Sequence, residues 1–272
     1  IVRRPWIERL LATTVVSRSP YPHLHFQFQL TPHMGSKTFD YPFGHYLLKT
    51  GNSFSLESFE FPKTGQVLTS PAINAVLAKA FHFIPGQHLK VNVEVDSEIK
   101  KWQKHAGIFS WVVETDVFNT TYIKCEKDGG LAYLYNNGNL HYFTNFTGTK
   151  NSALYWFYLS LFKVPLGFLP NSKITDTIPL NQMFGGLLKV LQDFIAPLYL
   201  FLKVDFELKM KEAGDILSSG DIEMDTIITK KILGNTNKEF HSALKINQEG
   251  EIEISVEFKE ARIKILCQNE LE

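Results

Sequence analysis

The sequence predicts a mainly β protein with a few helices. Long runs in which polar and apolar residues alternate indicate strands, and the clearest runs cover residues 199–210, 221–230, 240–246, 251–258 and 261–266. Turn-forming glycines separate these runs, among them Gly220, Gly234 and Gly250. Because each strand can pair with the next through a short turn, we expect an antiparallel meander of the kind that builds a β-sandwich.

The middle of the chain carries further strand signals and two hairpins. Alternation indicates strands at residues 55–61, 89–95 and 109–117. Two tight turns follow, and each is flanked by residues that favour strands: Lys127-Asp128-Gly129-Gly130 lies between 122–126 and 131–135, and Asn136-Asn137-Gly138-Asn139 lies between 131–135 and 140–143. Asn-Gly is the strongest short hairpin signal, so we expect these strands to be neighbours in a sheet.

Three segments have the features of helices. Residues 71–80 show helical spacing behind a possible cap at Ser70. Residues 151–164 are mostly apolar and predict a buried helix, with a buried strand as the alternative. A third helix is expected over about 180–195.

Composition and charge limit the classes of function that this chain can have. The chain has 272 residues, 44% of them hydrophobic and 21% charged, which is typical of a folded globular protein with one large domain or two smaller ones. Lys+Arg and Asp+Glu both number 28, so a zero net charge removes any broad electrostatic case for binding nucleic acid or an anionic membrane surface. The most apolar stretches are 153–162, which is too short to span a bilayer, and 187–202, which contains charged residues and a proline. No transmembrane helix is expected.

The two cysteines, Cys125 and Cys267, lie in no metal-binding or redox motif. We expect two buried thiols, with a disulfide between them as the alternative.

Residues 22–30 alternate strictly and predict a half-buried strand near the start of the chain. His23 and His25 are two positions apart, so both rings leave the same face of that strand. This geometry allows one histidine to hold a metal while the other acts on a metal-bound water. The simpler interpretation is that both are polar residues on the solvent face of a strand.

The run Pro22-His23-Leu24-His25-Phe26 resembles the last signature of the lysostaphin-type (LytM-type) zinc endopeptidases. The resemblance implies that His25 is a zinc ligand and that His23 is the general base or transition-state stabiliser. Zinc in such a site lowers the pKa of its bound water and polarises the peptide carbonyl of a cell-wall cross-bridge. The resemblance also implies a bacterial cell envelope setting, periplasmic or extracellular, with peptidoglycan or another envelope polymer as the partner.

The rest of that metal site is absent from the sequence. Gln27 stands where the family has Glu, and Thr13-Thr14-Val15-Val16 stands where the family has a glycine-rich turn. None of the nine histidines is followed by Asp four positions later, so the family's second pair of ligands is missing. Catalytic zinc usually takes three protein ligands. His33, Asp40 and His45 are the other groups that could approach the site, and we expect this chain alone to be inactive.

These observations predict two parts. Residues 1–50 are expected to be the C-terminal end of a peptidase-type β domain, and residues 51–272 an antiparallel β-sandwich-like tail with a few helices. Since the chain opens on Ile1 without Met, we expect a piece of a larger envelope protein.

The first functional hypothesis is a fragment of a cell-envelope zinc metalloendopeptidase that acts on peptidoglycan peptides. The alternative is a non-enzymatic module that binds a wall polymer or a partner protein. An aromatic group on the second hairpin bears on the choice, because its side chains either stack on sugar rings or fill the core. It comprises Tyr133, Tyr135, Tyr142, Phe143 and Phe146.

Overall fold

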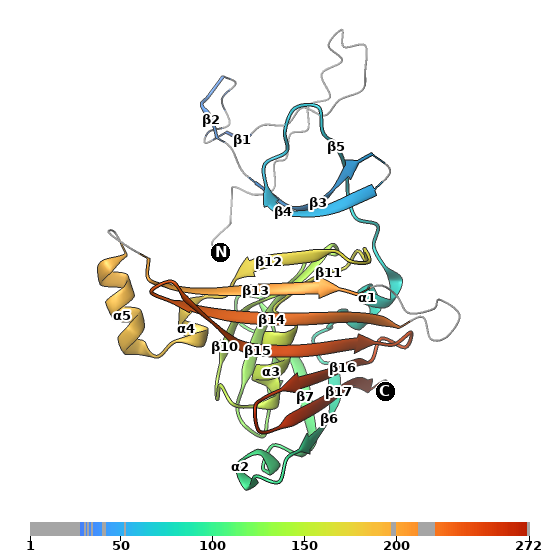
Figure 1. The fold of residues 1–272 in the computed structure, drawn as a ribbon. Coiled ribbons are helices and arrows are strands. Elements are labelled where there is room, and N and C mark those ends of the chain that lie inside the picture. Colours follow the sequence, from blue (N-terminus) through green and yellow to red (C-terminus); the bar gives the residue numbers. More distant parts are fainter. Residues whose placement is uncertain are drawn as a thin grey trace.

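A computed structural model describes residues 28–29, 31, 33, 35–39, 42–51, 53–196, 200–211 and 221–270 of the chain. Antiparallel strands dominate the described residues, and five short helices accompany them (Figure 1). The expected mainly β class with a few helices is confirmed.

One twelve-stranded antiparallel sheet forms the body of the molecule (Figure 1). Its spatial order is β11-β10-β9-β8-β7-β6-β17-β16-β15-β14-β13-β12. The strands are β6 (His88–Asp96), β7 (Gly107–Thr115), β8 (Thr121–Cys125), β9 (Leu131–Asn136), β10 (Leu140–Thr147), β11 (Lys163–Pro165), β12 (Lys173–Thr177), β13 (Leu202–Met210), β14 (Ile222–Ile232), β15 (Asn235–Ile246), β16 (Ile252–Glu257) and β17 (Arg262–Glu270).

Two meanders meet in the middle of this sheet. Strands that are consecutive in the sequence are neighbours in the sheet from β6 to β11, and again from β12 to β17. The last strand, β17, then pairs with β6 along its whole length, from Arg262 opposite Asp96 to Glu270 opposite His88. In place of the two facing sheets of a sandwich, this long-range pairing joins both meanders into a single continuous sheet.

The sheet encloses a helix, α3 (Ala153–Ser160), and every side chain of that helix is buried. The helix begins where the Ser152 hydroxyl accepts a hydrogen bond from the Tyr155 N–H at 3.3 Å. α3 touches strands of both meanders, and its Phe157 ring lies edge-on to Trp111 of β7 at 5.1 Å. Because all of its faces meet the sheet, the helix needs no polar side, which explains the apolar run that predicts it.

Side chains connect the two end strands of the sheet, β11 and β12. Lys163 of β11 forms an ion pair with Asp176 of β12, and the lysine is almost fully buried. Nearby, α4 (Leu180–Met183) reaches β10, where the Gln182 amide donates to Asn145 Oδ1 at 2.7 Å and to the Phe146 carbonyl at 3.2 Å. These contacts hold the sheet in a roll around α3.

The remaining helices differ from expectation in their boundaries. α1 (Ala75–Ala80) begins at Asn74, whose side chain accepts from two N–H groups of the first turn, so the cap expected at Ser70 is wrong. The helix expected over 180–195 is interrupted around Phe184 and Gly185, and its second half is α5 (Gly186–Ile195).

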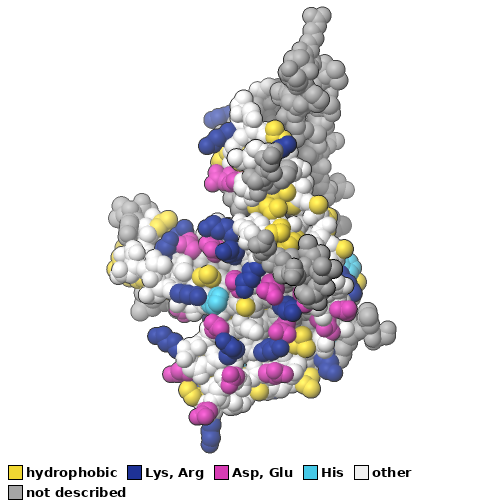
Figure 2. Space-filling model, turned by 45° about the vertical axis from the view of Figure 1, so that its right-hand side comes forward, with side chains coloured by type: hydrophobic (Ala, Val, Ile, Leu, Met, Phe, Trp, Pro, Cys, Tyr) yellow, Lys and Arg dark blue, Asp and Glu magenta, His cyan; other side chains and the backbone are white. Residues whose placement is uncertain are grey.

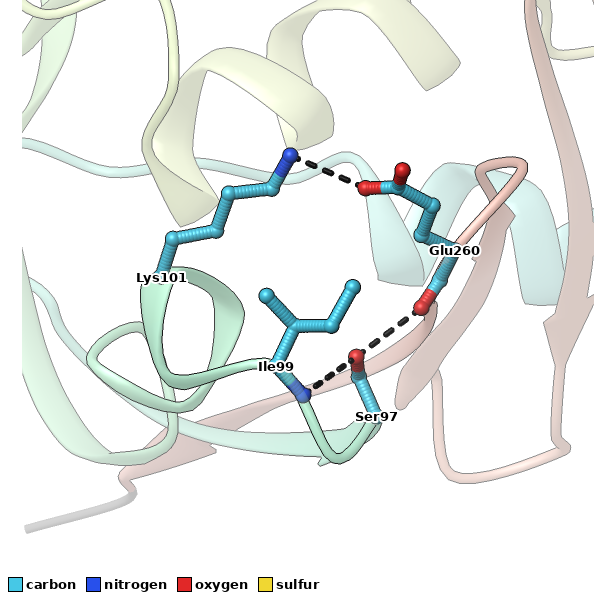
Figure 3. Close-up of polar contacts among 4 residues, drawn as sticks. All are labelled: Ser97, Ile99, Lys101 and Glu260. Atoms are coloured by element: carbon cyan, nitrogen blue, oxygen red, sulfur yellow. Dashed lines mark hydrogen bonds and ion pairs between the residues drawn. The ribbon is translucent and has the colours of Figure 1, made fainter.

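α2 (Lys100–Gln103) lies in the β6–β7 connection and is fastened to the turn between β16 and β17 (Figure 3). The Ser97 hydroxyl donates to the Glu260 carbonyl at 2.9 Å, and the Lys101 ammonium pairs with the Glu260 carboxylate at 2.9 Å. Behind them, Trp102 stacks on Phe258 with 4.7 Å between ring centroids. The connection therefore closes one end of the roll.

Two small sheets precede the body. β3 (Phe43–Thr50) pairs with β4 (Ser53–Glu60) and with β5 (Val67–Thr69), while β1 (Phe28–Gln29) pairs with β2 (Thr38–Phe39). β4 lies against the edge strand β12 (Figure 1). The boundary expected between residues 50 and 51 falls in the turn of the β3–β4 hairpin, and the assignment of residues 1–50 to a peptidase remnant stays a prediction.

Both cysteines are free, buried thiols, as expected. Cys125 lies on β8 and Cys267 on β17, with β6 and β7 between those strands. Among the described residues, no helix combines the length and the apolar character needed to cross a membrane.

Candidate functional site

The residues of the expected zinc site fall largely outside the described part of the chain. His23, His25 and Asp40 are not among the described residues. His33 is exposed in a bend, where its carbonyl accepts from the Ser36 hydroxyl at 2.6 Å, and His45 belongs to β3. The zinc site and the role of His23 as its base therefore stay predictions.

Within the described ranges, no group of three or more His, Cys, Asp or Glu side chains could hold a metal ion. Two of the remaining histidines are nevertheless unusual. His105 lies between Trp102 and Trp156, and burial lowers the pKa of its imidazole. His141 is fully buried among phenylalanines.

The aromatic group on the β9–β10 hairpin divides between the two faces of the sheet. Phe143 and Phe146 are buried in the core, whereas Tyr135 is 52% exposed and Tyr133 and Tyr142 are half-buried. The division follows from a bulge in β10 between Phe143 and Asn145, which turns two residues three positions apart to the same inner face. Phe143 and Phe146 therefore fill the core, whereas sugar stacking by the three tyrosines stays a prediction.

Four tyrosines line the outer face of three adjacent strands. Tyr122 of β8 lies opposite Tyr133 of β9 with ring centroids 5.2 Å apart, and Tyr135 of β9 lies opposite Tyr142 of β10 at 5.4 Å. Tyr133 and Tyr135 are two positions apart on one strand, so they leave the same face about 7 Å apart. We call these four residues the tyrosine row. The aromatic group predicted from the sequence does not include Tyr122, because this residue lies on the preceding hairpin. The register of the two hairpins is the signal that would place Tyr122 opposite Tyr133.

Polar groups border the tyrosine row. The Tyr122 hydroxyl donates to Glu114 Oε2 at 2.7 Å, and this hydrogen bond raises the pKa of the tyrosine. Lys124 Nζ lies 3.6 Å from the other oxygen of Glu114, and Asn145 stands opposite Tyr133 at the edge of the row. The site thus combines ring faces with both hydrogen-bond donors and acceptors.

Two turns fix the register of the strands that carry the row. In the β8–β9 turn, Asp128 Oδ1 accepts from the Gly130 N–H at 2.9 Å, and the Gly129 N–H donates to the Cys125 carbonyl at 3.0 Å. In the β9–β10 turn, Asn137 Oδ1 accepts from Leu140 N at 2.9 Å, while Gly138 has φ +85°. Because turn geometry sets register, these residues decide which tyrosines face each other.

A second candidate is a shallow depression of about 500 Å³ beside the β16–β17 turn. Its lining residues are Asp96, Glu257, Phe258, Glu260, Ala261 and Arg262. Arg262 binds Glu257 at 3.0 Å and lowers the pKa of that carboxyl, and Lys101 does the same for Glu260. Since its lining is mainly charged side chains and holds no cluster of exposed aromatic rings, the tyrosine row is the stronger candidate.

Comparisons with family models, with curated proteins and with solved structures found no match for this chain.

Proposed function

We propose that this protein is a binding module that holds a polysaccharide chain along the tyrosine row. The observation that carries the proposal is the row itself, two cross-strand pairs of aromatic rings, staggered along β9, on the outer face of β8, β9 and β10.

The chemistry of the row suits sugar rings. One face of a pyranose ring presents C–H groups, which pack against the flat face of an aromatic ring, while the hydroxyl groups point outward from the ring edge. Tyrosine offers a large, rigid contact area at little cost in conformational entropy. Glu114, Lys124 and Asn145 lie beside the row and offer the donors and acceptors that sugar hydroxyls need.

Tyrosine favours strands and cross-strand aromatic pairs stabilise a sheet, yet this sheet uses other residues at comparable outward positions. Elsewhere, outward positions carry charged side chains, and Figure 2 shows Lys, Arg, Asp and Glu interspersed over the body of the molecule. On β13, for example, Lys203, Asp205 and Lys209 alternate with buried apolar residues. A binding role is a general reason for exposed aromatic residues to gather on a protein surface.

The resemblance of residues 22–26 to zinc endopeptidases favours peptidoglycan as the polymer, with the cell envelope as the setting. The glycan strands of peptidoglycan present a continuous series of sugar rings. In a longer protein, a peptidase domain ahead of such a module would be held at its substrate. The peptidase fragment and the polymer-binding module expected from the sequence would then be two parts of one protein.

The test is retention of the purified full chain on insoluble peptidoglycan, cellulose and chitin. We expect binding to at least one polymer, and loss of binding in the double variant Tyr133→Ala/Tyr135→Ala. Each ring removed should weaken binding about tenfold, which corresponds to about 1.4 kcal/mol. Tyr135→Phe keeps the ring face and should bind within a few-fold of the wild type.

Ile108→Ala is the matched control, because Ile108 is exposed on the outer side of β7 and lies outside the row. Circular dichroism would establish that all variants are folded. Equal retention of the wild type and the double variant, or no retention of the wild type on any polymer, would refute the proposal.

A further inference from the structure

Helix α5 buries one polar residue, Gln192, and packs Ile195 against the core, while three of its apolar side chains lie in solvent. Gln192 is buried, and its Oε1 accepts from the N–H groups of Phe201 and Leu202 at 3.0 and 2.8 Å. Those hydrogen bonds fasten the helix to the start of β13. Val190, Leu191 and Phe194 follow helical spacing on the opposite side and are exposed, Phe194 to 84%. A helix that only covered a core would have the reverse orientation.

Two leucines extend this apolar side. Leu200 follows α5 and is 71% exposed, and Leu233 lies in the β14–β15 turn and is 68% exposed. The Leu233 N–H donates to the Phe201 carbonyl at 2.9 Å, which places the turn beside the segment after α5. We call Val190, Leu191, Phe194, Leu200 and Leu233 the apolar patch. Figure 1 shows α5 and the β14–β15 turn at the same end of the molecule.

The backbone at Leu233 gives independent support for a role of its side chain. Leu233 has φ +50° and Gly234 has φ +85°, so both adopt the left-handed conformation of a two-residue hairpin turn. Asn, Asp or Gly is preferred at the first of these positions, because a left-handed leucine is strained. A strained residue that also exposes a large apolar side chain points to a function rather than to folding.

Lysines surround the base of the apolar patch. Lys203 and Lys231 share the single carboxylate of Asp205, each at 2.7 Å, which leaves a positive charge in excess. Lys230 forms an ion pair with Glu239 at 2.8 Å, and its charge adds to burial in lowering the pKa of Lys150. Four lysines (Lys150, Lys203, Lys230 and Lys231) thus stand against three carboxylates (Asp205, Glu239 and the exposed Asp193 of α5), a positive excess of one that the zero net charge of the chain conceals.

We propose that the apolar patch docks onto an anionic lipid surface, with α5 lying in the plane of the membrane. Apolar side chains flanked by lysines are what holds an amphipathic helix at the boundary between headgroups and acyl chains, and each nearby lysine adds attraction to anionic lipid. A second copy of the chain fits less well, because a symmetric contact through this patch would bring two sets of lysines together. The site is separate from the tyrosine row, so the proposal is independent of glycan binding.

The test is flotation of the full chain with vesicles of phosphatidylcholine, with or without phosphatidylglycerol. We expect binding to the mixed vesicles at low salt, and binding about tenfold weaker at high salt or without phosphatidylglycerol. Phe194→Ser should weaken binding about tenfold. Leu233→Asn should also weaken it, yet raise the midpoint of thermal unfolding because Asn tolerates a positive φ.

Phe118→Ser is the control, since Phe118 is equally exposed but lies in the β7–β8 turn. Its binding should match that of the wild type. The proposal is overturned if the wild type binds neither vesicle, if Phe194→Ser and Leu233→Asn bind like the wild type, or if Phe118→Ser loses as much. It is also overturned if light scattering shows a dimer that Phe194→Ser dissociates while lipid has no effect.

Discussion

Acidification should destabilise the fold through one buried imidazole, that of His141. This side chain is fully buried against Phe81, Phe83 and Phe143, with ring centroids 4.7, 5.7 and 5.0 Å away. Neither of its nitrogens has a hydrogen-bond partner. No charged group from these neighbouring segments faces the ring, and burial lowers its pKa from 6.5 to about 3.

The sign and size of the effect follow from proton linkage. The unfolded chain binds a proton near pH 6.5, whereas the folded protein resists protonation until about pH 3, so unfolding takes up a proton between these values. The contribution of His141 to stability is complete above pH 6.5 and is lost as the pH falls toward 3. The loss from this residue amounts to about 2 kcal/mol at pH 5 and approaches about 5 kcal/mol below pH 3.

The assay is urea unfolding at about pH 7, 6 and 5, followed by tryptophan fluorescence, for the wild type and His141→Phe. The free energy of unfolding of the wild type should fall about 2 kcal/mol further than that of the variant between pH 7 and 5. The comparison of slopes cancels the other titrating groups and any change in packing caused by Phe. His82→Gln, at an exposed position, should keep the slope of the wild type. Parallel slopes for the wild type and His141→Phe would refute the reasoning.

Three further predictions concern the metal, the sheet and the cysteines. Calorimetry should show only weak zinc binding to the full chain, since the sequence lacks a His-x-x-x-Asp pair; tight stoichiometric zinc that disappears in His25→Ala would contradict this. By circular dichroism, deletion of residues 1–20 should lower the midpoint of thermal unfolding only slightly, whereas deletion of Glu251–Leu266 should abolish cooperative unfolding because it removes β16 and half of β17 from the middle of the sheet. Cys125 and Cys267 should react with a thiol reagent only after unfolding, because both are buried and burial raises the pKa of each thiol; rapid reaction of the native protein would show that the strands open locally.

The sequence predicted the strands well because alternation and turn residues each depend on only a few neighbouring positions. Alternation over 221–230 and 251–258 corresponds to β14 and β16, and the glycine turns define the hairpins between the C-terminal strands. The pairing of β17 with β6 left no such signal. It joins residues about 170 positions apart, and nothing in either strand specifies the other beyond a matching apolar face.

The sequence did not show which side chains of the candidate site face outward, mainly because a bulge changes the alternation along β10. An unbroken alternation along β10 would put Phe143 and Phe146 on opposite faces, but the bulge between them turns both inward. The orientation of α5 was hidden for a related reason. Its apolar spacing predicts a helix equally well whether that side meets the core or the solvent, and only the hydrogen bonds of Gln192 decide between the two.

The roll around α3 also constrains where binding can occur. Its interior is filled by the helix and by aromatic side chains such as Trp111 and Phe157, so the described residues offer their chemistry on the outer face and at the ends. Outward positions on a strand accept Lys, Glu or Thr without loss of stability, and most of this sheet uses them in cross-strand pairs such as Lys264 with Glu253. Tyr133, Tyr135 and the strained Leu233 do not follow that rule, and none of the three packs in the core. For that reason the replacements Tyr135→Phe and Leu233→Asn are informative, since each should leave the fold intact or make it more stable while it isolates one property of a binding surface.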